Sequence, residues 1–347
     1  MYRRAYILLI GVAGLMGALT LIASASLDRP IVDPEGFLGP AAVRLPMLVL
    51  AAFAVDLVPR TIWASRGNPK LMPSLAMTRI KEHWTRERLL MVSLGIVCFY
   101  ITYVCYRTLK SWLPFIIDAK YDRELQLVDR ALFLGHDPAV VLHTVFGTGI
   151  TAHVLSSIYM LFIPMVAVLV TIWLVWTRNI SHGYWFVTSQ VLIWTLGTAT
   201  YYLLPTLGPG LRYAWLYNEL PDTGVKQLME SLANGRHQVL WFGLVDGVQS
   251  VAGFASLHTG VTLLWALMVQ YTVRSMWLKV VFWANFGITV LATLYFGWHY
   301  VADDVAGVTI ALVSFYLGAK ATGQKFDRGG RTTHPTTTTS KVPVEKH

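Results

Sequence analysis

The strongest constraint on this chain is a set of eight apolar stretches, each close to the length that crosses a bilayer as a helix. About 18 residues cover the roughly 30 Å of hydrocarbon at a rise of about 1.5 Å per residue. With 55% hydrophobic and 14% charged residues, the 347-residue chain has too few polar side chains to cover a soluble protein. The pattern predicts an all-α, polytopic membrane helix bundle with about eight transmembrane helices, at residues 5–27, 43–59, 89–107, 154–176, 184–204, 255–273, 277–297 and 300–319.

The basic residues alternate between loops in the way that orients a membrane protein. The chain has a formal net charge of +9, with 28 Lys and Arg against 19 Asp and Glu. Placing the N-terminus inside puts 18 of the 28 basic residues on the inner side, as the positive-inside rule requires. Topology therefore explains the excess charge better than a nucleic-acid partner does. The same orientation puts His258 and His299 at the outer face.

Three regions follow from the spacing of the apolar stretches. Residues 1–88 hold two expected transmembrane helices and a basic loop, which either lies on anionic lipid or is a solvated loop. A cleaved signal peptide competes with a retained helix over residues 1–28, and the length of the apolar run favours retention. Residues 89–320 form the main membrane domain, and residues 321–347, rich in Gly, Thr and Lys, are expected to be a disordered cytoplasmic tail.

The segments between the stretches are expected to cover the outer face. Apolar residues at helical spacing, with acids and arginines between them, predict an amphipathic surface helix containing Ile117, Tyr121, Leu125, Val128 and Leu132. The apolar run 139–150 is too short to span and is expected to be interfacial or re-entrant. Two prolines and two glycines in residues 205–210 end the fifth stretch, and a long loop without obvious structure is expected to follow.

The second of two histidines at the starts of apolar stretches has a carboxylate at a useful spacing. His299 and Asp303 are four residues apart, so a helix beginning here would place them on one face, one turn from each other. A carboxylate in that position orients an imidazole and stabilises its positive charge. Asp304 points elsewhere on such a helix and is a weaker candidate.

The first histidine, His258, lies in the first turn of the sixth expected span, with Ser256 as its N-cap. Unpaired backbone N–H groups at a helix N-terminus form a favourable environment for a phosphate. Two histidines, one carboxylate and one anion site at a single membrane face match phosphoryl transfer through a histidine. The alternative is that these polar residues only anchor helix ends among the lipid headgroups.

At these residues the chain resembles the type 2 phosphatidic acid phosphatase (PAP2) superfamily, and within it the inositol phosphorylceramide synthase-like branch. Residues 255–258 (Ala-Ser-Leu-His) are similar to the superfamily's Ser-Gly-His motif, with Leu in place of Gly as in that branch. His299 to Asp303 match its His-x-x-x-Asp motif. Tyr202 begins a segment that resembles the branch's Tyr-x-Leu-Pro, and residues 122–135 resemble its upstream outer segment. The likeness covers about residues 90–320 and implies a six-helix catalytic core.

Two departures from the superfamily concern the positive charge that a phosphate needs. The chain has no Lys-x6-Arg-Pro motif, and Thr293 stands where phosphatases carry an arginine six residues before the histidine. Because a phosphate needs cationic partners, other residues must supply the charge. Arg212 is the first candidate, followed by Lys226 and Arg236, although each is equally well explained as an ordinary loop charge.

The resemblance implies that His299 is the nucleophile, Asp303 its orienting partner and His258 the acid for the leaving alcohol, with Ser256 and Tyr202 contacting substrate. It implies a phosphotransferase without metal or cofactor, moving a phosphorylated headgroup, with phosphoinositol the one that the branch suggests. The implied partners are a phospholipid donor, a lipid or glycan alcohol acceptor and the lipids of a plasma membrane, with the site on the extracytoplasmic face. The alternatives are a lipid or polyprenyl phosphate phosphatase, and a non-catalytic transporter or scaffold.

Overall fold

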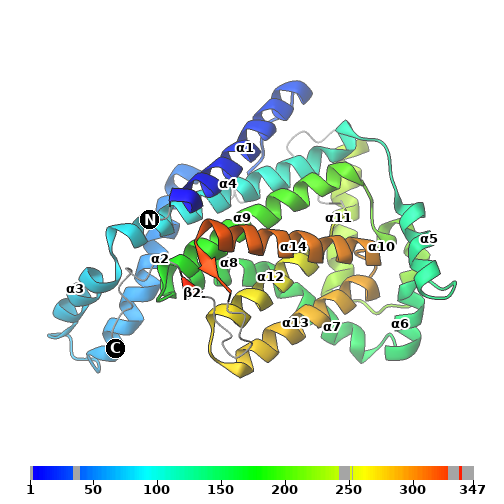
Figure 1. Ribbon diagram of the computed structural model, residues 1–347. Helices are drawn as coiled ribbons and strands as arrows, with labels where there is room; N and C mark the ends of the chain where they lie inside the picture. The colour runs from blue at the N-terminus through cyan, green and yellow to red at the C-terminus, as the bar shows by residue number, and fades with distance from the viewer. Residues whose placement is uncertain (1–2, 34–39, 242–250, 252, 327–335, 338–347) are drawn as a thin grey trace.

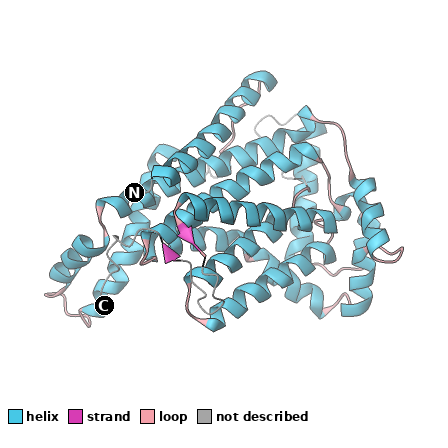
Figure 2. Cartoon of the chain, in the orientation of Figure 1, coloured by secondary structure: helices cyan, strands magenta, loops and turns pink. Residues whose placement is uncertain are grey.

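The computed structural model describes residues 3–33, 40–241, 251, 253–326 and 336–337, which form a bundle made almost entirely of helices (Figures 1 and 2). The predicted all-α membrane bundle is confirmed. The helices are α1 (Arg3–Leu27), α2 (Ala41–Ala64), α3 (Met72–His83), α4 (Arg86–Ile116), α5 (Asp122–Leu132), α6 (Pro138–Phe146), α7 (Ile150–Met160), α8 (Phe162–Thr171), the π-helix η2 (Ile172–Trp176), α9 (Ile180–Leu203), α10 (Pro209–Arg212), the 3-10 helix η3 (Ala214–Tyr217), α11 (Gly224–Trp241), α12 (Leu257–Thr272), α13 (Met276–Tyr295) and α14 (Val301–Ala321).

All eight apolar stretches are helical. Among the described residues, six helices are long and apolar enough to cross a membrane: α1, α2, α4, the run Ile150–Trp176, α13 and α14. The other two stretches form α9 and α12. α9 packs against α1, α4, α12 and α14, so it lies inside the bundle. It can therefore carry polar side chains such as Ser189 and Gln190, both 0% exposed. α12 has 16 residues and is about 24 Å long, which is shorter than the roughly 30 Å of hydrocarbon.

Local sequence signals determine where several helices begin and end. The predicted N-cap at Ser256 is confirmed, because its hydroxyl accepts a hydrogen bond from the Thr259 N–H at 3.3 Å. Thr85 and Ser275 cap α4 and α13 in the same way. Gly147, with φ of +74°, ends α6 in a backbone conformation that favours glycine.

Short elements cover one end of the bundle. α5, α6, α10 and α11 gather there, and α3 lies at the opposite end (Figure 1). The run 139–150 is largely α6, a nine-residue helix that is too short to span, as predicted. The prediction of an unstructured loop after residue 210 was wrong, because the chain forms α10, η3 and the 18-residue α11 there. Because α11 is rich in polar residues, it contains no long apolar stretch that would indicate a helix.

The predicted amphipathic helix is α5, but its buried face differs from the predicted one. Val128 and Leu132 are 46% and 60% exposed, whereas the acids Asp122 and Asp129 are 2% and 1% exposed. The acids are buried because their carboxylates accept hydrogen bonds from distant backbone N–H groups, which satisfy them there. α5 therefore turns its acids inward and part of its apolar side outward.

The two ends of the chain pack against the bundle to different extents. α1 packs against α4 and α9, with Ala5 and Leu9 fully buried. The expected disorder after Lys320 falls largely outside the described residues. Among those that are described, α14 continues to Ala321, and strand β1 (Gln324–Lys325) pairs antiparallel with β2 (Thr336–Thr337).

Candidate active site

Two glycines let α12 and α14 cross closely enough to bring the two histidine segments together. A Cβ on Gly260 would lie 2.8 Å from the backbone oxygen of Gly307, and a Cβ on Gly307 would overlap the backbone oxygen of Ser256. Small residues at such a crossing allow backbones to approach closely. The rings of His258 and His299 lie 6.4 Å apart, measured between centroids.

Asp303 contacts His299 from the first turn of α14. Its Oδ2 lies 3.2 Å from His299 Nδ1 and accepts a hydrogen bond from the Tyr300 N–H at 3.0 Å. The expectation that His299 itself lies on the helix was wrong, because α14 begins at Val301. The pair forms because Asp303, the third helical residue, reaches back over the helix N-terminus. Asp303 is 0% exposed and His299 7%, so the pair is shielded from water.

Asp304 points away from this pair, as its position in the sequence predicts. Its Oδ1 accepts a hydrogen bond from the Thr259 hydroxyl at 2.5 Å, and its Oδ2 accepts one from the Thr293 hydroxyl at 2.9 Å. Asp304 therefore joins α12, α13 and α14. Thr293, at the position where a phosphatase arginine was expected, takes part in this internal network.

His258 is held by aromatic side chains from α7 and α8. The Tyr159 ring stacks on it with centroids 4.4 Å apart, and the Tyr159 hydroxyl lies 3.2 Å from His258 Nδ1. The Phe162 ring packs 4.2 Å away. A hydroxyl bound at Nδ1 fixes the orientation of the imidazole and leaves Nε2 as the second nitrogen for chemistry.

The two buried acids of α5 connect the turn at residues 205–210 to the segment that carries His299. Asp122 accepts hydrogen bonds from the N–H groups of Leu207 and Gly208 and from the Tyr300 hydroxyl, all at 3.0 Å. Asp129 accepts one from the Val301 N–H at 3.1 Å, at the start of α14. These contacts position both the turn at residues 205–210 and the segment that carries His299.

Burial also changes the acidity of these two carboxyl groups. Burial raises the pKa of Asp122 above its ordinary value. Burial raises the pKa of Asp129 to about 7, and neighbouring carboxylates act in the same direction. The protonation of Asp129 therefore changes near neutral pH.

The turn at residues 205–210 and α6 pack tightly on the residues just before His299. The Gly210 N–H donates to the Gly297 oxygen at 2.6 Å, and a Cβ on Gly208 would lie 2.5 Å from the Trp298 oxygen. His143, on α6, contacts the Tyr295 oxygen at 2.9 Å through Nε2. Glycine is required at position 208 because its φ is +88° and the approach is close.

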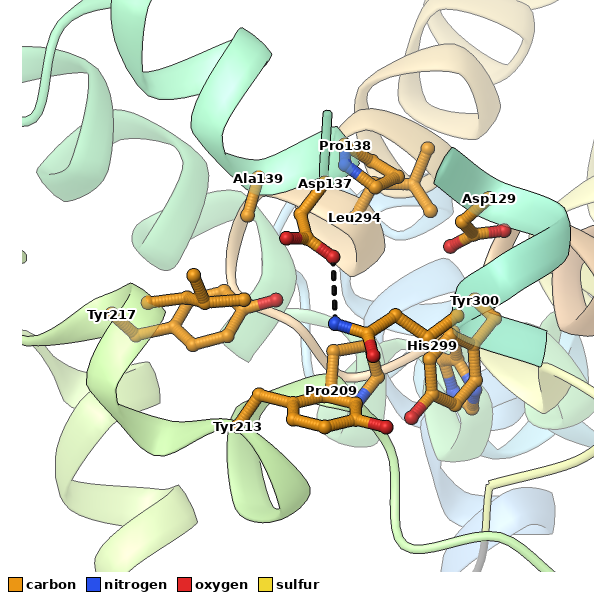
Figure 3. Close-up of a pocket in the computed structure, with 12 residues that line it drawn as sticks. Asp129, Asp137, Pro138, Ala139, Pro209, Tyr213, Tyr217, Leu294, His299 and Tyr300 are labelled. Carbon is orange, nitrogen blue, oxygen red and sulfur yellow. Dashed lines mark hydrogen bonds between the residues drawn. The ribbon is translucent and has the colours of Figure 1, made fainter. Parts of the chain in front are cut away.

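A small hollow lies beside His299, between α5, α6 and η3 (Figure 3). Its wall includes Asp137, whose carboxylate binds Arg130 at 2.8 Å and accepts the Gln126 amide hydrogen bond at 2.8 Å. The hollow has about 10 Å³ of room, close to what one water molecule needs. It is lined by Gln126, Asp129, Asp137, Pro138, Ala139, Pro209, Tyr213, Leu216, Tyr217, Leu294, His299 and Tyr300.

The predicted substrate contacts also include Tyr202, Lys226 and Arg212. The Tyr202 hydroxyl donates to the Leu109 oxygen at 2.7 Å, so it is engaged by α4. The Lys226 ammonium, on α11, donates to the Leu220 oxygen at 3.1 Å. Arg212, on α10, is exposed.

Arg236, on α11, is a predicted substrate contact that the charge of Asp122 influences. Burial lowers the pKa of Arg236, and the charge of Asp122 opposes this shift. The Asp122 carboxylate also binds Tyr300, next to His299.

Sequence reasoning missed two contacts of the histidines. Tyr159 and Phe162 lie about one hundred residues before His258 in the sequence, inside an apolar stretch where they resemble packing residues. Nothing in the sequence near Tyr159 indicates that its ring and hydroxyl contact His258. Only the packing of α7 and α8 against α12 identifies them.

Comparison with known proteins agrees with this arrangement at the level of the superfamily. No curated protein and no solved structure matches the chain. A family model described as the PAP2 superfamily matches residues 123–317, more than half of the chain, and includes both histidines and Asp303. The match does not extend to the inositol phosphorylceramide synthase-like branch. With eight helical apolar stretches and this match, the chain is a helical membrane protein that belongs to the PAP2 superfamily of phosphatases and phosphotransferases.

Proposed function

We propose that the protein is a membrane phosphotransferase that moves a phosphorylated headgroup from a phospholipid to an alcohol through a phospho-histidine at His299. The observation that carries the proposal is the pairing of two histidines 6.4 Å apart: half-buried His258, and buried His299, which is bound to Asp303. A phosphorus atom between two such rings is within reach of a nucleophile on one side and a proton donor on the other.

The proposed reaction has two displacement steps. The lone pair of His299 Nε2 attacks phosphorus, the bond from phosphorus to the diacylglycerol oxygen breaks, and His258 gives that oxygen a proton. The acceptor alcohol then attacks phosphorus and gives its proton to His258, while the bond from phosphorus to Nε2 breaks. Both histidines return to their starting state. Asp303 stabilises the positive charge that develops on the His299 ring.

Transfer to an alcohol in preference to water is supported by the cover over His299. A transferase must keep water from its phospho-histidine. The turn at residues 205–210 and α6 pack on residues 295–298, and the carboxylates of α5 fix this cover by hydrogen bonds. A further stretch, residues 239–245, is expected from the sequence to cover the site as well, but it lies partly outside the described residues. Phosphoinositol as the headgroup and a lipid or glycan alcohol as acceptor rest on the branch resemblance.

The proposed location is the outer face of a plasma membrane. α5, which binds Tyr300 and Val301 next to His299, lies with α6, α10 and α11 at the end of the bundle opposite the basic helix α3 (Figure 1). Basic segments favour the cytoplasmic side. This placement lets the protein use donors from the outer leaflet.

Product analysis tests the proposal directly. Purified protein is incubated with headgroup-labelled phosphatidylinositol and a lipid extract, and we expect diacylglycerol together with label on an alcohol. His299→Ala should abolish turnover and the acid-labile phosphoenzyme. His258→Ala should slow substrates with poor leaving groups most. Equal activity of both variants with wild type would favour a scaffold.

Hydrolysis of a lipid or polyprenyl phosphate is the second candidate, and the hollow beside His299 favours it. Room for about one water molecule next to the nucleophile would suit a phosphatase. Rapid release of inorganic phosphate from phosphatidic acid, unaffected by added alcohol, would establish this candidate in place of the first.

A further inference from the structure

Four buried carboxyl groups lie around the two histidines. Asp122, Asp129, Asp303 and Asp304 are 2%, 1%, 0% and 5% exposed, and all lie on the segments that surround the rings. An anionic phosphoryl group binds in such surroundings only if a cation lies with it. Thr293 cannot supply that charge, and its hydroxyl binds Asp304.

Lys110, on α4, places a cation among the aromatic side chains next to the histidines. Its Nζ lies 4.9 Å from the centroid of the Tyr201 ring and 5.6 Å from that of Tyr106, and donates to the Tyr106 hydroxyl at 3.4 Å. α9, which carries Tyr201, also contacts the His258 segment, because the Thr200 hydroxyl accepts a hydrogen bond from the Ala255 N–H at 3.0 Å. The half-buried Lys110 therefore places its ammonium over the residue that follows Thr200, on the helix that contacts the His258 segment.

We propose that the Lys110 ammonium binds the phosphoryl oxygens of the lipid substrate and supplies the charge that position 293 lacks. The inference rests on the proposed function, because it assumes that a phosphoryl group binds between the histidines. Lysine suits this role as a compact charge with three donors. The rings of Tyr106 and Tyr201 would hold the ammonium in place by cation–π contact.

The position of Lys110 argues against a role limited to membrane anchoring. It lies six residues before the end of α4, about 9 Å along the helix, where a lysine that needed only water would extend toward the surface. Its ammonium instead lies over Tyr201 and Tyr106, which are 2% and 8% exposed. Lys110 also precedes residues 123–317, so the superfamily match does not assign it.

The test compares Lys110→Met, Lys110→Arg and Lys120→Gln. Lys120 is an exposed lysine in the segment after α4, so its variant removes the same charge away from the cluster. We expect Lys110→Met to lower kcat/KM on phosphatidylinositol micelles by about 10- to 100-fold and to weaken inhibition by orthovanadate to a similar extent, from the loss of one charge-assisted contact. Lys110→Arg should recover part of both, and Lys120→Gln should match wild type. A Lys110→Met protein with wild-type kcat/KM and orthovanadate inhibition would overturn the inference.

A labelling experiment on the unmodified protein covers the case in which Lys110→Met does not fold. Orthovanadate should slow modification of Lys110 by an amine reagent and leave Lys120 unaffected. Equal modification of Lys110 with and without orthovanadate would also overturn the inference. Failure of the proposed function gives a different result: wild-type protein would turn over no phospholipid and form no phospho-histidine.

Discussion

Replacing Asp303 by Asn should slow phosphoryl transfer without changing the fold or the tautomer of His299. The same atom, Oδ2, contacts His299 Nδ1 at 3.2 Å and accepts the Tyr300 N–H at 3.0 Å. An amide NH2 at that place would oppose the Tyr300 N–H, so the Asn oxygen must occupy it. The oxygen still accepts from Nδ1, and Nε2 keeps its lone pair. The variant therefore removes the charge and little else.

The size of the effect follows from the distance. Two unit charges 3.2 Å apart interact by about 5 kcal/mol at an effective dielectric constant of about 20. This is a ceiling on what Asp303 contributes to the positive His299 ring, because the neutral hydrogen bond remains. A loss of about 3 to 4 kcal/mol corresponds to a rate lower by about 10²- to 10³-fold.

The assay measures kcat and KM for headgroup transfer together with the thermal midpoint in detergent. We expect kcat to fall by that factor while KM and the midpoint stay close to wild type, since binding and packing are unchanged. Asp118→Asn is the matched control, because Asp118 is exposed in the segment before α5. A folded Asp303→Asn protein with kcat within about threefold of wild type would refute the role of this charge.

Three further predictions concern stability and topology. Because the pKa of Asp129 rises from 3.8 to about 7 on folding, the folded state keeps a proton that the unfolded chain releases; stability should fall by at most about 4 kcal/mol between about pH 4 and pH 7. Asp129→Asn should lack this fall, as thermal midpoints at about pH 5 and about pH 8 would show. Gly307→Ala should lower the free energy of unfolding by about 1 to 3 kcal/mol, and with it the thermal midpoint and kcat, because its Cβ overlaps the Ser256 oxygen. An unchanged midpoint would contradict the close crossing. Cysteines at Lys70 and Asp222, with Cys98 and Cys105 replaced, should react with an impermeant reagent from opposite sides, and same-side labelling would rule out the topology.

The features predicted well from the sequence are those with a local signal. Helix length and composition located all eight apolar stretches, because a span must be apolar over about 18 residues. The four-residue spacing of His299 and Asp303 indicated a contact that forms within one turn, although the helix begins two residues after His299. Ser256 is a cap because its hydroxyl meets an N–H only three residues away.

The features that were missed depend on partners far along the chain. The acids of α5 face inward because they bind N–H groups more than eighty residues away, at Leu207 and Val301. Helical periodicity alone assigned those acids to the surface. Tyr159 likewise lies within an apolar stretch, and its contact with His258 exists only after α7 has packed near α12. The contact of Lys110 with Tyr201 forms only when α4 packs against α9.

The charge balance of the site also bears on which lipid it accepts. Of the four buried carboxylates, Asp122, Asp129 and Asp304 are bound by N–H or O–H donors, and Asp303 is shared between His299 and the Tyr300 N–H. A phosphate monoester brings a charge of about −1.5 to −2 at neutral pH, whereas a diester brings about −1. With the charge of Lys110 as its counterpart, a diester is close to neutral in this site and a monoester leaves an excess negative charge among buried carboxyl groups. Since each uncompensated buried charge is costly, the arrangement favours a diester donor over phosphatidic acid, which is the preference expected of a headgroup transferase.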